Sequence, residues 1–513
     1  MPRDLPLSNG KLLVNFDPSY NLRDLYWPHI GHQNHTDGHI SHSGVWVDGQ
    51  FSWFGDDGWR RDLRYESETL VTRVTLEHDG LGLTLLCNDV VDFDRDLFLR
   101  RIEVTNHADH PREVRLFFHH DWHLYESEGA NTVGYRPELK ALIAYKDRCY
   151  VLVNGLTGGA DAGDPAETRH ATMGVLSWAT GYKEFKGQLG TWKDAEDGVL
   201  GGNPIAQGSV DSCVGFQLGT VAPGGSAVCY QWLAVASGYR HVRDLNQMVV
   251  ARGPQSFFDR THDYWHLWIN KRPVDLGDLP DSLVDLYKRS LLVLRTQIDN
   301  DGAIIAATDS DVWTFARDSY AYMWPRDGAL VANALSHSGY GDITRSFFEF
   351  CASVITEDGY LLHKFTPSGA LGSSWQPWSD EHGEPELPIQ EDETALVIYS
   401  LWQHYMLFRD VEFVRPFYRP LIKSGADFLA RYREPHTQLP DTSWDLWEER
   451  RGIHAYTVAA VYGGLQAAAQ FAACFGETDL AERYTTAADE IKAATRKYLW
   501  HEGEGRFVRR VTV

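Results

Sequence analysis

The chain has 513 residues, which is too long for one hydrophobic core and predicts two or more domains. Its 71 acidic and 48 basic side chains give a formal net charge of -23, which argues against nucleic acid or an anionic membrane as a partner because phosphate would be repelled. The six cysteines are scattered without a CxxC pair, which argues against a disulfide framework or a zinc site.

The N-terminus shows no secretory signal. The first ten residues, MPRDLPLSNG, contain no apolar run of the kind that a signal peptide needs. We therefore expect a cytoplasmic protein with reduced thiols. The most apolar long stretch, 454–476, contains two glutamines and many small residues, so we expect a buried helix there rather than a membrane span.

The first half of the chain predicts β-structure. Short segments rich in branched side chains recur with polar turns between them and without helical periodicity. This pattern is typical of an antiparallel β-sandwich, which we place at residues 1–253. A glycine-rich run at 154–165 is expected to form a surface loop. The predicted strands are 70–76, 83–87, 97–104, 113–118, 141–153, 172–178, 211–219 and 226–236.

Helical patterns begin near residue 254. The aromatic side chains of 256–271 recur at helical spacing, and Pro273 and Pro280 follow, so 254–280 is predicted to be a helical linker. A helical domain is predicted over 281–513. Its first helix is expected to begin at Asp281 or Ser282, and the others at 327–338, 341–355, 391–408, 411–433, 453–475 and 478–499.

The last two predicted helices differ in character. The segment 454–475 is apolar nearly all round, whereas 478–499 carries one apolar stripe. An inner, doubly buried helix followed by an outer, half-solvated one predicts a two-layer barrel of helical hairpins. A helical bundle or a solenoid is the alternative, although no short sequence repeat favours a solenoid.

The segment 318–328, DSYAYMWPRDG, combines aromatic and charged side chains at a predicted helix start. Arg326 offers a fork of hydrogen-bond donors and Asp327 offers acceptors, a pair that can hold adjacent sugar hydroxyls. A salt bridge with a capping aspartate explains the pair as well, and for this segment alone that structural explanation is preferred.

The segment 443–451, SWDLWEERR, places two glutamates beside two tryptophans. An aromatic wall removes water from a carboxyl group and favours its neutral acid form, which is what protonation of a glycosidic oxygen requires. The structural alternative is that Glu448 and Glu449 are solvated acids in the first turn of a helix and that the tryptophans belong to a core.

Two further segments lie in loops before predicted helices. In 373–378, SSWQPW, the tryptophans suit ligand stacking and packing under a loop equally well. In 386–395, ELPIQEDETA, the acids suit a helix N-terminus with Asp392 as a cap, and this structural role is our expectation. All four segments lead into helices, and in a helical barrel such loops gather at one end.

The histidine-rich stretches do not have a recognised metal-ligand spacing. We expect them to face solvent or to fill polar pockets, and we predict no metal site. These histidines are His29, His32, His35, His39, His42, His119, His120 and His123.

Together, the four segments resemble the glucoamylase family of glycoside hydrolases, family 15, in its bacterial and archaeal branch. The opening LPLSNGKLLVNFDPSYNLRDLYWP at 5–28 is similar to the N-terminal domain of that branch, and YAYMWPRDG at 320–328 resembles its Tyr-x-x-x-Trp-x-Arg-Asp motif. PIQEDETAL at 388–396 and SWDLWEE at 443–449 resemble two further blocks. The resemblance implies an antiparallel super-sandwich, a helical linker and an (α/α)6 barrel.

The resemblance also implies an activity. The expected enzyme is an exo-acting, inverting α-glucoside hydrolase that needs no cofactor and releases glucose from the non-reducing end of α-glucans, α-glucooligosaccharides or trehalose. By resemblance, Glu448 is the general acid. Arg326 and Asp327 are implied to hold the terminal glucose, and Tyr320 and Trp324 to shape the pocket around the developing oxocarbenium.

The neighbouring subsite is implied to contain Trp447 and Glu449. Fungal members of the family have a tryptophan where this chain has Glu386, so that residue's role is not transferred. Trp375 or Trp378 is the expected substitute.

The chain departs from the family at its C-terminal end. An inverting mechanism needs a second carboxylate roughly 6.5–9.5 Å from the acid. The family supplies this base from a Glu-Gln motif that does not follow Glu448 here, so we expect the closing helices and the base to lie outside this chain. Two alternatives are a clan-related α-glucoside phosphorylase, in which phosphate replaces the activated water, and a non-catalytic glucan-binding paralogue.

Overall fold

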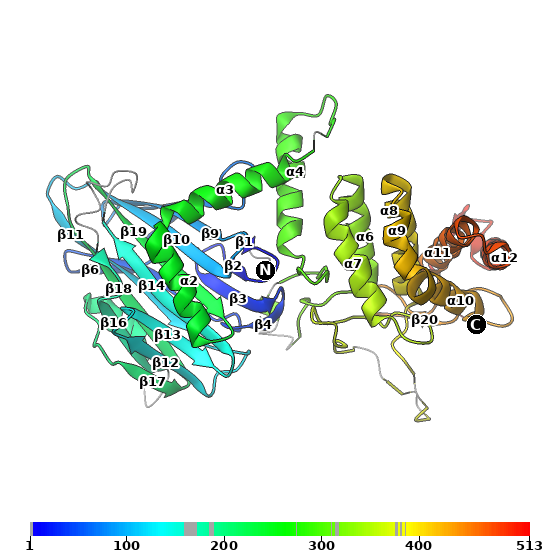
Figure 1. Cartoon of the computed structure of the whole chain (residues 1–513), viewed down its shortest axis with the longest axis horizontal. Helices are drawn as coiled ribbons and strands as arrows, with labels where there is room; N and C mark the ends of the chain where they lie inside the picture. Colours follow the sequence, from blue (N-terminus) through cyan, green and yellow to red (C-terminus); the bar gives the residue numbers. More distant parts are fainter. Residues whose placement is uncertain are drawn as a thin grey trace. The chain divides into compact units, whose positions relative to one another are not determined.

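The computed structural model describes residues 4–158, 172–183, 189–272, 274–308, 310–312, 318–374, 378–379, 382–384 and 386–512. The chain divides into two compact units, one formed by Met1–Gln297 with Thr308–Ser319 and the other by Ile298–Ala307 with Tyr320–Val513. The first unit consists mainly of strands and the second mainly of helices (Figure 1). The domain boundaries predicted at 253/254 and 280/281 stay predictions.

Within its described residues, the first unit contains a ten-stranded sheet in which bonded neighbours run antiparallel. The order is β17-β12-β13-β14-β19-β10-β9-β8-β7, and β15 pairs with β14. Side chains alternate between core and solvent, as in β8, where Val74 and Leu76 are buried between less buried neighbours. The strands are β7 (Arg60–Tyr65), β8 (Thr72–His78), β9 (Leu83–Val91), β10 (Leu97–Asn106), β12 (Asn131–Arg136), β13 (Ala141–Lys146), β14 (Cys149–Thr157), β15 (Thr172–Met173), β17 (Ile205–Gly208) and β19 (Ser226–Ala236).

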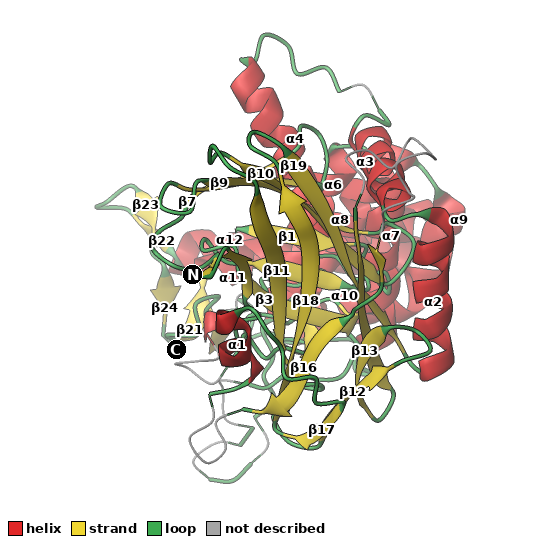
Figure 2. Cartoon of the chain, turned by 90° about the vertical axis from the view of Figure 1, so that its left-hand side faces the viewer, coloured by secondary structure: helices red, strands yellow, loops and turns green. Residues whose placement is uncertain are grey.

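Two smaller antiparallel sheets belong to the same unit (Figure 2). The order of the five-stranded sheet is β16-β18-β11-β5-β6, and that of the four-stranded sheet is β1-β2-β3-β4. These elements are β1 (Leu5–Ser8), β2 (Leu13–Phe16), β3 (Leu22–His29), β4 (His32–Asn34), β5 (Ser43–Val47), β6 (Gln50–Trp53), β11 (Arg112–Asp121), β16 (Ser177–Tyr182) and β18 (Val210–Val221), with the short helices α1 (Thr191–Asp194) and η2 (Ala195–Asp197).

The two larger sheets face each other. A Cβ atom added to Gly155 in β14 would lie 2.4 Å from the ring of Phe216 in β18, so glycine is required where the sheets approach. The predicted antiparallel β-structure of the N-terminal half is confirmed. A loop was predicted at 154–165, but residues 154–157 belong to strand β14. Residues 159–165 lie outside the described residues.

Between β19 and residue 297, the described part of this unit forms three helices, and the sequence did not predict the first of them. α2 buries Val242, Asn246 and Val249, and its partly buried Tyr239, Leu245 and Met248 pack against the same core cluster. Asn246 Oδ1 also accepts hydrogen bonds from Trp232 Nε1 at 3.0 Å and Asn154 Nδ2 at 2.9 Å. The helices are α2 (Tyr239–Arg252), α3 (Gln255–Ile269) and α4 (Asp281–Thr296).

The second unit is helical, and several predicted bounds are reproduced closely. The helix predicted at 391–408 has those bounds, because acidic residues begin it and an apolar run fills it. The elements are α6 (Pro325–His337), α7 (Gly341–Val354), α8 (Glu391–Phe408), α9 (Val411–Val414), η3 (Arg415–Phe417), η4 (Tyr418–Lys423), α10 (Ser424–Arg431), α11 (Ala455–Cys474) and α12 (Thr478–Tyr498), with strands β20 (Ser443–Trp444), β21 (Arg451–His454), β22 (Trp500–His501), β23 (Arg506–Phe507) and β24 (Arg510–Val511).

The single helix predicted at 411–433 is wrong. The segment consists of an α-helical turn, a 3-10 turn, a π-helical turn and then α10. Pro416 lies in the 3-10 turn and Pro420 in the π-helical turn. Because proline donates no backbone hydrogen bond and its ring crowds the preceding turn, a continuous α-helix cannot pass through them.

The predicted contrast between the last two helices is present. α11 is buried on nearly all sides and packs on both α8 and α12, whereas α12 buries one stripe that includes Tyr484, Ala487 and Ile491. A Cβ atom on Gly464 of α11 would lie 2.8 Å from the carbonyl oxygen of Ala395 in α8, so the two helices touch backbone to backbone. Among the helices of the described residues, none is both long and apolar enough to cross a membrane.

Candidate active site

Two segments far apart in the sequence line one pocket of the helical unit. The start of α6 and the loop between β20 and β21 enclose a cavity of about 460 Å³, a size typical of small-molecule sites. The described lining residues are Ala306, Tyr320, Trp324, Arg326, Asp327, Leu446, Trp447 and Glu448. Six of the seven predicted site residues therefore lie together.

Glu449 is the predicted site residue that does not line this pocket. Its side chain is 61% exposed, and its carboxylate lies 3.8 Å from Arg509 Nη2. Trp378 also lies outside the described lining. It is 44% exposed, and its carbonyl oxygen accepts a hydrogen bond from the Glu386 backbone N–H at 2.8 Å. Trp375 lies outside the described residues.

The aromatic side chains of the pocket divide by exposure. Trp324 is buried, whereas Tyr320 is 47% and Trp447 is 70% exposed. Large aromatic faces left open beside a polar pocket are unusual in a structural turn and are suited to a flat ligand. The explanation that these rings simply fill a core holds for Trp324 but not for Tyr320 or Trp447.

Arg326 is buried at the start of α6, where Pro325 takes the first helical position. Its Nη1 lies 2.6 Å from Gln390 Oε1, 3.2 Å from Asp392 Oδ2 and 3.0 Å from Glu393 Oε1. Burial opposes the positive charge, but the adjacent Glu393 and Asp392 carboxylates raise the pKa of Arg326 overall. The guanidinium is therefore a permanent cation held by α8.

Asp327 remains the accessible member of the pair. Its carboxylate lies 3.5 Å from Arg326 Nη2, and its side chain is 51% exposed. No side-chain capping bond is made at the start of α6, so the capping explanation of Asp327 is wrong. Arg326 orients Asp327, and the Asp327 oxygens are free to accept hydrogen bonds from a ligand.

The acids of 386–395 were expected at a helix start with Asp392 as the cap. Glu391, Asp392 and Glu393 do lie in the first turn of α8, but the cap assignment is wrong. Gln390 is the N-cap residue, and no side chain makes a capping bond. Glu391, Asp392 and Glu393 are all buried. Burial raises the pKa of both Asp392 and Glu393 although Arg326 favours their charged forms, and Glu393 also accepts a hydrogen bond from the Arg326 backbone N–H.

Among the described residues, no cation pairs with Glu391, and burial raises its pKa to about 8 although Ser443 favours the charged form. The native state therefore keeps a proton that the unfolded chain loses between about pH 4.5 and 8, and stability falls as pH rises through this window. Glu391→Gln cannot ionise, so it should not lose stability over this window. We expect the unfolding free energy of the variant minus that of the unmodified protein to rise by about 3 kcal/mol from pH 4.5 to pH 7. Urea unfolding at both pH values measures this, and a difference that does not change with pH would contradict it.

The second pocket segment is a turn closed by a short antiparallel pair. Ser443 pairs with Gly452 and Trp444 with Arg451, and the next helix begins only at Ala455. The alternative of two acids in the first turn of a helix is therefore wrong. Glu448 has a φ angle of 57°, a left-handed conformation that is uncommon for glutamate and that clusters at functional sites.

Asp445 holds this strained turn. Its Oδ1 accepts hydrogen bonds from the backbone N–H groups of Glu449 at 2.9 Å and Arg450 at 3.3 Å, and its carbonyl oxygen accepts one from Glu448 at 2.7 Å. Arg509 Nη2 donates to its Oδ2 at 2.5 Å. Burial opposes the Asp445 charge, but these donors lower its pKa overall. The ionised Asp445 carboxylate thus stabilises the backbone conformation of the turn that contains Glu448. The sequence did not reveal this role.

Glu448 turns its carboxyl group toward a histidine that the sequence did not single out. Glu448 Oε1 lies 2.5 Å from His363 Nε2, and Trp324 Nε1 donates to the same His363 nitrogen at 3.1 Å. The side chains of His363 and Glu448 are 2% and 16% exposed. The carboxyl group is thus shielded from bulk water in the same pocket as the Arg326–Asp327 pair.

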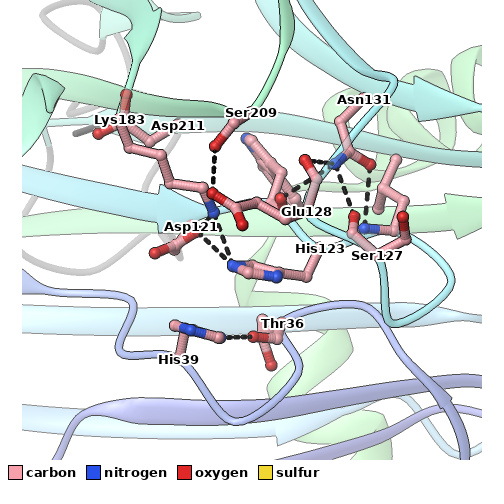
Figure 3. Close-up of polar contacts among 12 residues, drawn as sticks. Thr36, His39, Asp121, His123, Ser127, Glu128, Asn131, Lys183, Ser209 and Asp211 are labelled. Atoms are coloured by element: carbon pink, nitrogen blue, oxygen red, sulfur yellow. Dashed lines mark hydrogen bonds and ion pairs between the residues drawn. The ribbon is translucent and has the colours of Figure 1, made fainter. Parts of the chain in front are cut away.

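The histidine-rich stretches meet in the other unit (Figure 3). The rings of His39 and His123 stack with centroids 3.9 Å apart, and potential ligand atoms of Asp37, His39 and His123 lie within 4.8 Å of one another. Lys183 Nζ lies 2.6 Å from His123 Nε2 and pairs with Asp121, so an ammonium group already occupies that nitrogen. The absence of a metal site stays a prediction.

Comparison with known proteins connects this geometry to a family. Residues 283–509, which include the whole pocket, match the family described as glycosyl hydrolases family 15. An uncharacterized glycosyl hydrolase of Methanocaldococcus jannaschii is 24% identical over 98% of this chain and 75% of its own length. The family match and these relatives support a glucoamylase-like glycoside hydrolase of family 15.

Further relatives match all or part of the chain. A glucoamylase of a Clostridium species is 27% identical over 44% of this chain and 29% of its own length. A solved structure of a bacterial glucoamylase complexed with acarbose superimposes with a TM-score of 0.73 and 16% identity, over 99% of this chain and 69% of that one. This likeness shows a glucoamylase-like fold, with antiparallel sheets followed by a helical part.

Proposed function

We propose that the chain is an exo-acting, inverting α-glucoside hydrolase that releases glucose from the non-reducing end of α-glucans, α-glucooligosaccharides or trehalose. The observation that carries the proposal is the position of Glu448, a shielded carboxyl group on a strained turn in the pocket that also contains Asp327. Glucoamylases among the relatives support the exo-acting mode and glucose as the product.

In this proposal, Glu448 donates a proton to the glycosidic oxygen as the bond to the anomeric carbon breaks. Asp327 accepts hydrogen bonds from the terminal glucose, and Arg326 orients it. Tyr320 and Trp324 form the wall beside the developing oxocarbenium, where an electron-rich ring face stabilises positive charge.

The neighbouring subsite would use the exposed ring of Trp447 as a platform, with Glu449 at its outer edge. Asp327 and Glu448 carry the carboxylates among the described lining residues, and Asp327 is assigned to hydroxyl binding. Neither Asp327 nor Glu448 is therefore assigned as the base of the inverting reaction.

The proposal extends to the fold of the helical part. The buried α8 and α11 and the half-exposed α12 support an inner and an outer layer, which is the arrangement of hairpins in an (α/α)6 barrel. We place this barrel within residues 281–513, after a linker at 254–280 and a β super-sandwich at 1–253.

The experiment that tests the function measures glucose release from maltotriose, isomaltose and trehalose by proton NMR, with and without inorganic phosphate. We expect release from at least one substrate without phosphate and with β-glucose as the first product, because inversion at an α-linked carbon gives the β-anomer. α-Glucose as the first product would contradict inversion. Glucose 1-phosphate formed only with phosphate would instead support the phosphorylase alternative.

A further inference from the structure

His363 makes the closest polar contact to the carboxyl group of Glu448 within the part of the chain that the structure describes. It lies between α7 and α8, where its backbone N–H donates to the Pro388 carbonyl oxygen at 3.1 Å. Its Nε2 lies 2.5 Å from Glu448 Oε1 and accepts the indole N–H of Trp324 at 3.1 Å. One nitrogen thus meets both a potential catalytic acid and a fixed donor.

The protons around this nitrogen can be assigned from chemistry. An indole N–H only donates, so His363 Nε2 must present its lone pair to Trp324. The proton between Nε2 and Glu448 Oε1 must then belong to Glu448. This corresponds to a neutral His363 with its proton on Nδ1 and Glu448 in the carboxylic acid form. Both donors then share the single Nε2 lone pair, and Nδ1 has no hydrogen-bond partner among the described residues.

Charged groups of both signs lie around the pocket. Lys364 is buried, with Nζ 5.1 Å from the centre of the Trp324 ring, and the buried Arg326 is paired with the buried carboxylates of Asp392 and Glu393. Asp327 is half exposed, Asp445 is paired with Arg509, and Glu449 is largely exposed.

We propose that His363 is a positioning residue that keeps the acid proton on Glu448 while the pocket waits for substrate. This inference rests on the proposed role of Glu448 as general acid. Trp324 fixes the tautomer of His363, and the neutral imidazole fixes the orientation of the Glu448 carboxyl group. A glycosidic oxygen that enters the pocket competes with Nε2 for this proton.

The proton balance leaves His363 unchanged. When the glycosidic bond breaks, its electron pair stays with the leaving oxygen, which takes the proton of Glu448. Glu448 becomes a carboxylate and regains a proton from solvent after the products leave. His363 remains neutral and holds the proton again.

Two substitutions separate positioning from packing. Glutamine at 363 can place a carbonyl oxygen near the position of Nε2 and accept both hydrogen bonds, whereas leucine accepts neither. The experiment measures the pH dependence of kcat/KM for an α-glucoside. In His363→Leu, the alkaline limb should move down by about one pH unit, because the acid form of Glu448 loses its hydrogen-bond acceptor. KM should change less than kcat. His363→Gln should keep the limb within about 0.3 units of the unmodified protein. An unmoved limb in His363→Leu, despite lower activity, would overturn the proposal.

A second measurement does not depend on activity. In protein labelled with nitrogen-15 at histidine, we expect the His363 signals, identified by their loss in His363→Gln, to report a neutral ring with the proton on Nδ1. Infrared spectra at neutral pH should show a carboxylic acid band that Glu448→Gln removes and Glu449→Gln retains. An imidazolium or an Nε2-protonated ring would overturn the proposal even if glucose is released. The expected spectra without hydrolysis would leave the proton arrangement standing and contradict the proposed function instead.

Discussion

Replacing Glu448 with glutamine is expected to lower kcat/KM for hydrolysis of α-glucosides by about 10³-fold, within the range seen when a general acid is removed. Glutamine keeps the shape of the side chain and can contact His363, but it has no proton to give to the leaving oxygen. Initial rates of glucose release from maltotriose measure the effect.

Glu449→Gln is the matched control for this prediction. Glu449 is adjacent in sequence and carries the same charge, but its side chain is 61% exposed and lies outside the described pocket lining. We expect a loss of less than about 10-fold, because an exposed residue of a neighbouring subsite contributes mainly to binding. Equal losses in the two variants would contradict the assignment of the acid to Glu448.

Replacing Arg326 with leucine is expected to lower the unfolding free energy of the helical unit by about 3–5 kcal/mol, because removing one partner of a buried ion pair leaves unpaired buried charge. The carboxylates of Asp392 and Glu393, both buried, lose their cation. Differential scanning calorimetry of the unmodified and variant proteins gives the change.

The control for Arg326 is Arg415→Leu in the same unit. Arg415 pairs with Glu412 at 3.3 Å, but both side chains are about 70% exposed, so we expect a loss of under about 1 kcal/mol. Similar losses in both variants would contradict the importance of the buried cluster.

The Arg326 variant should also depend on pH in a defined direction. Burial already raises the pKa of Asp392 and Glu393, and without Arg326 nothing opposes this rise. A carboxyl group with a raised native pKa binds more protons in the folded than in the unfolded state, so stability falls as pH rises. The stability loss of Arg326→Leu should therefore be smaller at pH 4.5 than at pH 8.

The fold was predictable where periodicity alone determines it. The apolar α11 and the amphipathic α12 follow from their sequences, and so does the long strand β19. The helix predicted at 411–433 is wrong because Pro416 and Pro420 interrupt the α-helical hydrogen bonds there. α2 was not predicted, although Val242, Leu245 and Val249 give it an apolar face and polar contacts of Asn246 also attach it to the sheet.

The site was predictable in composition but not in its internal contacts. Aromatic and acidic motifs indicated Trp324, Asp327 and Glu448, because these residue types suit sugar binding and proton transfer. His363 and Arg509 carried no local signal, since their partners lie 85 and 64 residues away in the sequence. Such pairs are set by tertiary structure, which no spacing rule in a single sequence reveals.

The proton-donating role of Glu448 is tested most directly by comparing two leaving groups in the Glu448→Gln variant. α-Glucosyl fluoride releases fluoride with little need for a proton, whereas maltose releases a sugar alkoxide that needs one. We predict that the variant loses about 10³-fold on maltose but less than about 10-fold on α-glucosyl fluoride. Equal losses on the two substrates would contradict the assignment of Glu448 as the general acid.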